Sequence, residues 1–479
     1  MPGEQPMATV NFAGIASGID TNALIDATVA ARRAQNVTPK SDKVQTLTDT
    51  NDALTTLKTK LSDLQTKIRE FTTLNGGGLA KIARSSDETI ITATAANAAS
   101  NGTYTITPTQ LAQNGTYAFK STAGTYSSSD AVIGSTIVGT GTVQIDIGTG
   151  TELQTVTLNV DNTTTLSQFA TNFNNSTSKA TASVINVGTS ASPDYRLVIN
   201  SLNEGTLKGS LSVTVSAAIT GASAFNNNSS SAAQNATFTV GGIGGGGGDV
   251  ITRYSNSFSD VIPGVTVTLQ NTSSTGISVS VGDDADATAA KIQDWVTAYN
   301  DIIAFIAEND AVTRQQDGND VTNIFNPLAS TSVDESMLSS IRGVISSAVY
   351  STGTQVRVLA DLGVTTERDG TLKFDSTVLT QAVANESASA KQLLKNFADT
   401  VSLTGGTIDQ YIRFNGIFDI TINGNKDLIT NLNDQIGRAE AAIAKEKESL
   451  TARFARLEAL IGRMQGQQSQ LTSALAGLS

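Results

Sequence analysis

The side chains that could do chemistry in this chain are carboxylates, because 43 aspartates and glutamates accompany no histidine and no cysteine. Without histidine there is no Ser-His-Asp triad, no usual general base near neutral pH and few ways to bind zinc. Without cysteine there are no thiol nucleophiles, disulfides or thiolate metal sites. A hydrolase that works with two carboxylates stays open as an alternative, but no spacing singles out such a pair. The composition therefore predicts no catalytic residue and a protein that is not an enzyme.

Three aspartates, Asp283, Asp284 and Asp286, form an acidic cluster that could bind calcium. An EF-hand loop requires glycine at its sixth position and a bidentate glutamate at its twelfth, and neither follows this cluster. The cluster instead precedes an apolar helical pattern that includes Trp295 and Tyr299. Carboxylates at a helix N-terminus cap its free amides and complement its dipole. We therefore interpret the cluster as a helix cap, expect both aromatic side chains in the core, and predict no metal site.

A nearly pure glycine run at residues 241–248 resembles a phosphate-binding loop only in composition. It lacks the Gly-Lys-Ser/Thr ending of such loops, and a strand that begins at Val250 follows it where a helix N-terminus would be needed. The run is predicted to be a loop within a hairpin. No cofactor is expected.

The strongest pattern is an apolar seam over residues 429–478, which repeats at alternating spacings of three and four residues. Only Glu446 and Gln468 interrupt it, and no proline lies beyond Pro327. The pattern predicts one helix of roughly 75 Å at about 1.5 Å per residue. A helix with one narrow seam needs a partner helix, and glycines such as Gly437 and Gly466 weaken it when it is alone. We therefore expect it to become ordered on assembly.

The candidate partner lies at the other end of the chain. Residues 41–74 carry leucines and other apolar residues at the same three-four spacing, and a shorter helix capped by Asp20 or Thr21 is expected to precede them as far as about Gln35. Two such helices at opposite ends predict a stalk with the middle of the chain looped out as a head. The alternative is that both helices belong to an ordinary bundle core.

The middle of the chain is predicted to be mostly β. From about residue 86 the apolar period becomes two, and clusters of Asn, Gly, Ser and Thr separate short candidate strands. One helix interrupts them at residues 165–174, and the Asn/Ser run at 225–231 is interpreted as a loop at a domain edge. Helices return at 283, including 335–349, 377–384 and 388–397, with a hairpin on Asp369-Gly370.

These patterns predict an α+β multidomain fold in which terminal coiled-coil helices and a helical-bundle domain flank nested, antiparallel all-β head domains. The expected domains are a mobile N-terminal leg, a helical stalk domain, a β head domain, a second β head domain inserted into the first, and a C-terminal coiled-coil leg. In that order they cover residues 1–40, 41–85 plus 283–425, 86–112 plus 231–282, 113–230, and 426–479.

The charge of the chain limits its partners. A net charge of −12 and a pI near 4.6 argue against nucleic acid and against anionic membrane surfaces. The sequence has no run of 18 apolar residues, so no transmembrane helix is predicted. Its N-terminal region has no basic segment followed by an apolar core, so no cleavable secretory signal is predicted.

Several stretches, in order along the chain, resemble one known family. They are GIASGIDT at 14–21, ASVIN at 182–186 with YRLVI at 195–199, NSFSDVIPGVT at 256–266, LADLGVT at 359–365 with DGTL at 369–372, FARLEAL at 454–460 and QLT at 470–472. They are similar to the bacterial flagellar filament cap family, FliD or hook-associated protein 2. The glycine run departs from the family pattern.

The resemblance implies a homo-oligomeric cap of roughly four to six copies at the distal tip of the flagellum. Family members leave the cell unfolded through the flagellar type III export channel, so the resemblance implies a secreted, extracellular protein of bacterial motility. Its implied partners are flagellin, the filament tip and an export chaperone at the C-terminal helix. The cap would hold emerging flagellin until it folds and inserts, and would prevent its leakage.

Apolar residues near both ends are the candidates for self-assembly and for docking on the filament. They are Ile15, Ile19, Leu24, Leu450, Phe454, Leu457, Ile461, Met464, Leu471, Leu475 and Leu478. Two further alternatives stay open. One is an adhesin at the flagellar tip whose β head binds host glycans or mucin, and the other is a different axial protein such as a hook–filament junction protein or flagellin.

Overall fold

The computed structural model describes residues 20–122, 125–133, 136–137, 141–220, 225–241, 249–317, 320–347 and 355–476, and the statements below concern these residues. The chain forms two compact units. One is helical and is drawn from Met1–Thr72, Lys291–Val378 and Lys395–Ser479. The other is mostly β and is drawn from Thr73–Ala290 and Leu379–Leu394. Among the described helices, none combines the length and apolar character that a membrane span requires.

The N-terminal helices of the helical unit are α1 (Thr21–Asn36) and α2 (Thr38–Arg69). The backbone N–H of Ala23 donates to Asp20 Oδ1 at 3.0 Å, so Asp20 is the N-cap that the sequence predicted. Val37 ends α1, and Pro39 lies in the first turn of α2, where its missing N–H would have had no helical partner. The second helix therefore begins a few residues earlier than residue 41.

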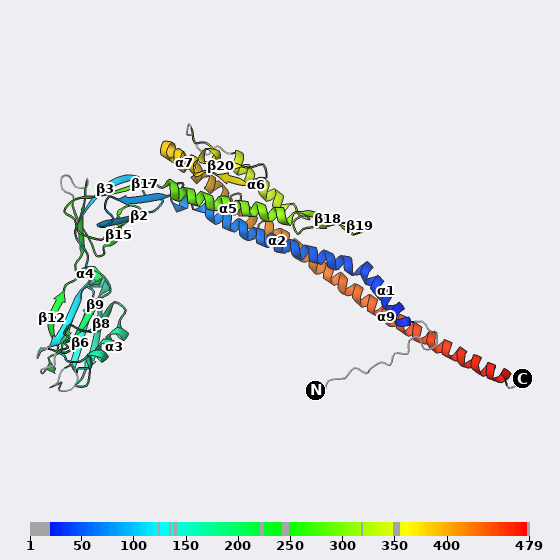
Figure 1. The fold of residues 1–479 in the computed structure, drawn as a ribbon, viewed down its shortest axis with the longest axis horizontal. Helices are drawn as coiled ribbons and strands as arrows, with labels where there is room; N and C mark the ends of the chain where they lie inside the picture. Colours follow the sequence, from blue (N-terminus) through cyan, green and yellow to red (C-terminus); the bar gives the residue numbers. More distant parts are fainter. Residues whose placement is uncertain are drawn as a thin grey trace. The chain divides into compact units, whose positions relative to one another are not determined.

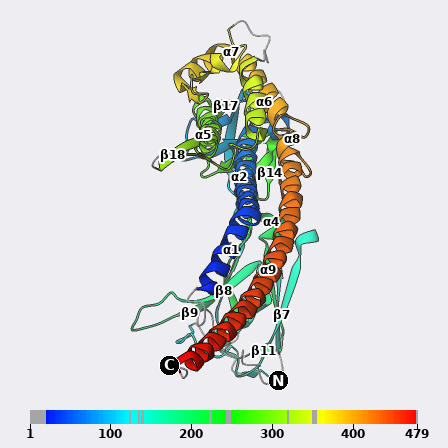
Figure 2. The ribbon, with the colours of Figure 1, turned by 90° about the vertical axis from the view of Figure 1, so that its right-hand side faces the viewer.

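The long C-terminal helix α9 (Ile417–Ala476) contains 60 residues and runs alongside α2 and then α1. Both views show the blue helices beside the orange part of α9, with the red C-terminal part continuing past α1 (Figures 1 and 2). The prediction of one long C-terminal helix is confirmed, and the helix starts before the seam does.

The central part of the apolar seam of α2 is buried. Leu54, Leu57, Leu61 and Leu64 have no exposed surface, and Lys60 Nζ lies 5.7 Å from the ring centroid of Phe305. That ring belongs to α5 (Ala285–Asn309), so α2 packs within a helical bundle as well as against α9. The alternative hypothesis, in which the terminal helices belong to an ordinary bundle core, is therefore partly correct for α2.

The remaining elements of the bundle follow α5. They are hairpin β18 (Val312–Asp317) and β19 (Asp320–Phe325), α6 (Val333–Ser347), the 3₁₀ turn η3 (Leu359–Leu362), hairpin β20 (Val364–Thr366) and β21 (Leu372–Phe374), α7 (Ser376–Ser402) and α8 (Asp409–Ile412). Trp295 is buried as predicted, with its ring 5.4 Å from that of Phe397. The two helices expected at 377–384 and 388–397 are confirmed as the two parts of α7, because Glu386 between them has non-helical backbone angles and kinks the element.

The first β core joins two antiparallel sheets. The larger has the order β1 (Lys81–Ser85), β17 (Ile277–Asp283), β3 (Gly102–Gln110), β13 (Ala236–Val240), β14 (Val250–Arg253), and the smaller has the order β15 (Ser257–Ile262), β16 (Val265–Leu269), β2 (Ile91–Ala95). Phe238 and Phe258 stack between them with ring centroids 4.4 Å apart. Because β13 pairs with β14, the glycine run lies between two paired strands, as predicted, although residues 242–248 are outside the described residues.

A second β core is inserted between β3 and β13 in the sequence. Its strands pair antiparallel in three sheets: β12 (Phe225–Ser231), β4 (Thr116–Ser121), β9 (Tyr195–Ser201), β8 (Ala180–Asn186); β10 (Leu211–Val215), β6 (Gly141–Ile147), β7 (Gln154–Val160); and β11 (Ile219–Thr220), β5 (Thr136–Ile137). Helix α3 (Leu166–Ser176) buries Phe169 and Phe173 in this core, and a capping box of Thr165 and Gln168 starts it. The chain has the predicted α+β fold, with helices before and after the antiparallel β strands in the sequence.

One strand contradicts the sequence prediction. Residues 225–231, expected to be a loop, form β12 and pair with β4. The run lacks the β-branched residues that favour strands, but β12 is the edge of its sheet, where pairing depends on backbone hydrogen bonds to one neighbour. The segment that the sequence analysis interprets as a loop at a domain edge is therefore a strand of the inserted sheet.

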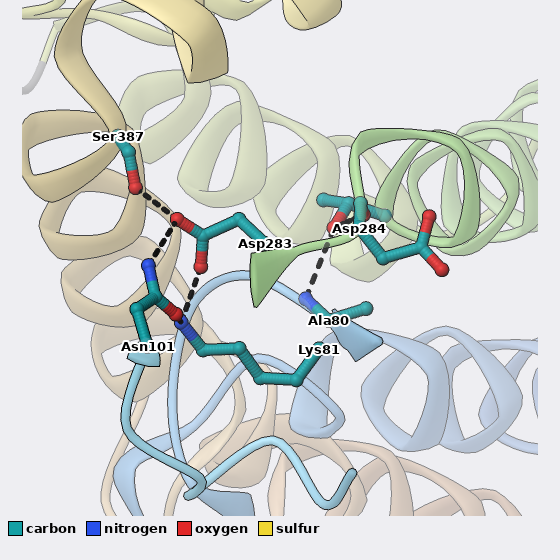
Figure 3. Close-up of polar contacts among 7 residues, drawn as sticks. Ala80, Lys81, Asn101, Asp283, Asp284 and Ser387 are labelled. Carbon is teal, nitrogen blue, oxygen red and sulfur yellow. Dashed lines mark hydrogen bonds and ion pairs between the residues drawn. The ribbon is translucent and has the colours of Figure 1, made fainter. Parts of the chain in front are cut away.

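The acidic cluster before α5 has two different roles (Figure 3). The backbone N–H of Ala287 donates to Asp284 Oδ1 at 2.9 Å, which confirms Asp284 as a helix cap. Asp283 instead forms an ion pair with Lys81 and accepts hydrogen bonds from Asn101 and from the Ser387 hydroxyl. The prediction that Asp283 caps the helix is wrong, because its carboxylate faces a buried ammonium across the sheet rather than the free amides of α5.

Candidate assembly surface on the terminal helices

Helices α1 and α9 run antiparallel, and three ion pairs fix their register. The pairs join Asp26 to Lys447 at 2.9 Å, Arg32 to Glu446 at 3.4 Å and Arg33 to Glu440 at 2.9 Å. All six side chains are substantially solvated, so each pair contributes at most about 1 kcal/mol. The pairs therefore align the helices, while apolar burial supplies most of the stability.

On the α1 side, the buried residues are Thr21 and Ile25. Leu24, a predicted assembly residue, is half exposed and lies outside this contact. Leu24 and Ile25 are adjacent in the sequence, so their side chains point about 100° apart around the helix axis, and only Ile25 faces the contact. Leu24 is thus available to another molecule rather than to α9.

Burial of the predicted seam changes along α9. The seam residue Ile443 is buried against the other terminal helices, and Leu450, Phe454 and Ile461 are partly buried. The seam residues Leu457, Met464, Leu471 and Leu475 are exposed. The chain therefore covers only the first part of the seam.

The exposed apolar residues at the C-terminal end of α9 form a surface that we call the distal stripe. Its members are between 48% and 65% exposed and are Leu457, Leu460, Met464, Leu471 and Leu475. Four of them were predicted as assembly residues, and Leu460 was missed because it falls between two seam positions. The predicted residues Ile15, Ile19 and Leu478 lie outside the described residues.

The distal stripe differs in charge from the rest of the chain. Residues 449–476 contain Arg453, Arg456 and Arg463 against Glu458, a balance of three positive charges and one negative charge. The whole chain has a net charge of −12. A basic apolar helix attracts acidic surfaces, and like charges weaken a parallel pairing with the same segment of another copy.

Glycines in α9 leave open space. A Cβ added at Gly424, Gly437 or Gly466 would meet no atom of the described residues within 4 Å beyond the helix's own neighbouring backbone. Packing within this chain therefore does not require them, although each costs a helix about 1 kcal/mol relative to alanine. They are the positions where another helix could approach α9 most closely.

A second exposed apolar stripe lies at the start of α9 and was not predicted. We call Phe414, Ile417, Ile420 and Leu428 the proximal stripe; Phe414 is 87% exposed and precedes the helix. The three helical members recur at spacings typical of one helix face, with Gly424 between Ile420 and Leu428. The signal is present in the sequence but lies before the predicted seam, which begins at residue 429.

The described residues contain no group of three or more acidic side chains placed to hold a metal ion. The paired carboxylates required for hydrolysis are not apparent in the geometry of these terminal helices, where acidic side chains pair with lysine or arginine.

Comparison with known families decides the relationship. The family model described as "Flagellar hook-associated protein 2 C-terminus" matches residues 233–466, and the one described as "Flagellar hook-associated protein 2 N-terminus" matches residues 17–115. The chain belongs to the flagellar hook-associated protein 2 (FliD) family. The FliD match includes Ile19 and Leu24 near the N-terminus and ends beyond Met464, before Leu471.

Similar proteins span the full length of the chain. It is 26% identical to the A-type flagellar hook-associated protein 2 of Pseudomonas aeruginosa, with 98% of each chain covered. It is 27% identical to the flagellar hook-associated protein 2 of Escherichia coli O157:H7, with 97% of this chain and 98% of the relative covered. Among solved structures, the D1-D2-D3 domains of the flagellar cap protein FliD from Escherichia coli match with a TM-score of 0.56 and 25% identity, over 78% of this chain and 99% of that one.

Proposed function

We propose that this protein is the structural cap at the distal tip of a bacterial flagellar filament. It forms a homo-oligomer, promotes folding and insertion of exported flagellin, and prevents flagellin from leaking into the medium. Its membership of the FliD family carries this proposal, since a solved relative over most of the chain is a flagellar cap protein.

The terminal helices supply the legs of the cap. The antiparallel α1–α9 contact and the uncovered distal stripe support docking by Leu457, Met464, Leu471 and Leu475. The partly covered Leu450, Phe454 and Ile461 continue the same seam, and Ile15, Ile19, Leu24 and Leu478 stay predicted members of the docking surface. Exposed apolar residues on one helix face are the usual signature of a helix that packs against another molecule.

The β cores supply the plate of the cap. The domain scheme places the head in residues 86–112 plus 231–282 with an inserted domain at 113–230, the helical stalk domain in 41–85 plus 283–425, and the legs in 1–40 and 426–479. Two separate buried β cores support a head of two domains. The mechanism is steric: the plate confines an emerging flagellin while the legs rearrange to admit it, and no covalent bond is made.

The partners are therefore other copies of this chain, flagellin and the filament tip, and an export chaperone at the C-terminal helix. The proposed copy number is roughly four to six, which is the range that the family resemblance implies for a closed homo-oligomer. The site of action is extracellular. The net positive charge of residues 449–476 favours an acidic partner surface over a parallel pairing of two distal stripes.

The adhesin alternative has no specific observation in its favour. The similar proteins with full-length matches are hook-associated protein 2 chains, and the solved relative is named for the cap. Binding of host glycans by the isolated β unit would be needed to bring the adhesin hypothesis forward.

Deletion of the gene, followed by quantification of flagellin in cells, filaments and medium, tests the proposal. The expected result is loss of filaments with monomeric flagellin in the medium, and rescue by the full-length chain. Normal filaments without the gene would overturn the proposal.

A truncated chain that ends at residue 449 provides the structural test. It retains the α1–α9 ion pairs and removes the distal stripe. We expect this chain to fold and to be exported but not to restore filaments. As a matched control, a full-length chain with Thr472→Ser keeps the stripe and should restore them.

A further inference from the structure

Hairpin β18–β19 is anchored at its base to the end of α5. The backbone N–H of Asn326 donates to the carbonyl of Ala311 at 3.0 Å, and that of Leu328 donates to the carbonyl of Asn309 at 2.9 Å. The side-chain amide of Asn326 also donates to the carbonyl of Glu308 at 2.6 Å. The turn at residues 326–332, which leads into α6, therefore closes the hairpin against α5.

The same turn is held by α2. The hydroxyl of Thr50 donates to the carbonyl of Pro327 at 2.7 Å, and Leu328 is completely buried beside it. Three helices thus meet at the hairpin base: α2 through Thr50, α5 through its last residues, and α6 through its first turn. A change at this point alters how the hairpin is held.

A buried carboxylate lies at this junction. Asp334, in the first turn of α6, has no exposed surface, and neither of its oxygens has a hydrogen-bond partner among the described residues. An ionised carboxylate in such a place loses its hydration with only partial compensation from the nearby backbone amides of Asp334 and Glu335, whereas a neutral carboxylic acid loses far less. The geometry therefore favours the protonated form.

The charges around Asp334 act in the same direction. Burial is the largest effect and raises the pKa of Asp334. The backbone amides of Asp334 and Glu335 lower it in part, and the carboxylates of Asp310, which follows α5, and Glu335 raise it again, so that the pKa of Asp334 is about 6. The turn at 326–332 contains no titratable side chain, Glu308 contributes its backbone, and α2 contributes the neutral Thr50.

We propose that Asp334 is a proton-operated latch that holds the base of hairpin β18–β19 between α5 and α6 when neutral and loosens it when ionised. Release transfers the carboxyl proton to water and leaves a carboxylate that is better solvated when the turn moves away. This device is independent of the proposed function.

The sign of the pH effect follows from the raised pKa. Because the pKa is about 6 in the folded protein and about 4 when the group is exposed, the latch is fully closed below about pH 4. The stabilisation that neutral Asp334 gives to the hairpin base is lost as the pH rises toward 6, and it changes little above pH 6. Acid therefore secures the hairpin and neutral pH loosens it.

The latch controls a surface with exposed apolar residues. Val312 and Phe325 pair across the base of the hairpin, and Ile324 lies on its other face; the three side chains are between 44% and 57% exposed. A two-stranded hairpin is marginally stable alone, so its position depends on its anchor. The state of Asp334 thus sets how firmly these apolar side chains are held against the bundle.

Hydrogen exchange of full-length protein tests the latch. Wild-type protein is compared with Asp334→Asn, whose amide imitates the neutral acid, from pH 4 to pH 7.5. In peptides that cover residues 311–334, the ratio of wild-type to variant opening is expected to rise about tenfold or more over this range. Taking the ratio at each pH removes the intrinsic pH dependence of exchange.

Two further variants separate a latch from a merely structural residue. Asp310→Asn removes a negative charge that raises the pKa of Asp334. The increase in opening with pH is therefore expected to level off at a lower pH than in wild-type protein. Asp301→Asn, at an exposed position of α5, should keep the wild-type profile. A ratio that does not change with pH overturns the proposal, and protection of wild-type protein that requires added Ca²⁺ overturns it in favour of a cation site.

Discussion

Lys81 and Asp283 are direct partners in the pairing of β1 with β17, and their side chains form an ion pair that is only 5% and 9% exposed. Asn101 joins both, accepting from Lys81 Nζ at 2.6 Å and donating to Asp283 Oδ2 at 3.2 Å. Burial alone would raise the pKa of Asp283, but hydrogen bonds from Lys81, Ser387 and Asn101 outweigh it and lower the pKa below its usual value. The carboxylate is therefore the stable form of this buried group.

Substitution Asp283→Asn is expected to destabilise the β unit by about 3–5 kcal/mol, because Lys81 is left buried without a counter-charge. The double variant Lys81→Met with Asp283→Leu should lose much less, since no charge is stranded. Denaturant unfolding of the three proteins measures the difference. The control is Asp260→Asn, which breaks the exposed Arg253–Asp260 pair in the same unit and should cost at most about 1 kcal/mol.

The Lys81–Asp283 ion pair also predicts a pH dependence of stability that is opposite in sign to that of Asp334. The pKa of Asp283 is lower in the folded protein than in the unfolded chain, so its contribution is present above about pH 4 and is lost as the pH falls through the folded value. Wild-type protein should lose stability below about pH 4 more steeply than Asp283→Asn. Equal slopes for the two proteins would contradict the role of this ion pair.

The distal stripe predicts a difference between neighbouring substitutions on α9. Leu471 is exposed in the single chain, so Leu471→Glu should leave the fold intact while weakening assembly by about ten- to a hundredfold, the loss expected for one buried leucine. Thr472→Glu places the same charge at the next position and serves as the control. Light scattering over a range of concentrations measures assembly, and equal effects of the two variants would argue against the stripe.

The open glycines predict that stability and assembly change in opposite directions. Gly466→Ala adds a methyl group that meets no described atom within 4 Å, and alanine favours a helix by about 1 kcal/mol. Hydrogen exchange should show slower opening of α9 in the isolated chain, whereas the assembled cap should be weaker because a partner helix can no longer approach closely. Stronger assembly would show that no partner uses this space.

Movement between α1 and α9 can be tested by cross-linking, because the chain has no cysteine of its own. Arg33 and Glu440 are ion-paired, so Arg33→Cys with Glu440→Cys places two thiols within reach of a reducible bis-thiol reagent. Cross-linked cap should stop filament growth, and reduction should restore it. Normal growth with the link intact would sink the idea that the legs rearrange, and Arg33→Cys alone controls for the reagent.

The sequence pattern located the long helices because their apolar residues recur locally, as in Leu54, Leu57, Leu61 and Leu64. It assigned the same capping role to Asp283 and Asp284, which is wrong for Asp283, since the partner of Asp283 lies about 200 residues earlier at Lys81. It also missed hairpin β18–β19 and strand β12. Their polar residues pair through the backbone, which leaves no apolar period to detect.

Within the assembly surface, the sequence predicted the seam but not where it is covered. Ile443 and Leu475 occupy equivalent positions of the apolar repeat, yet one is buried and the other exposed. The difference depends on where α1 lies along α9, which is set by pairs such as Asp26 with Lys447. Such register between distant segments cannot be derived from a repeat that is the same at every turn.

The insertion of one β core between β3 and β13 has a consequence for the order in which the molecule matures. These two strands are hydrogen-bonded neighbours, although more than a hundred residues separate them, and α2 awaits contacts from α9 near the other end of the chain. Closing a short loop loses less entropy than closing a long one, so structure forms from the middle of the polypeptide outward. We therefore expect the innermost core to close while both legs are still incomplete, and the helical unit to mature last.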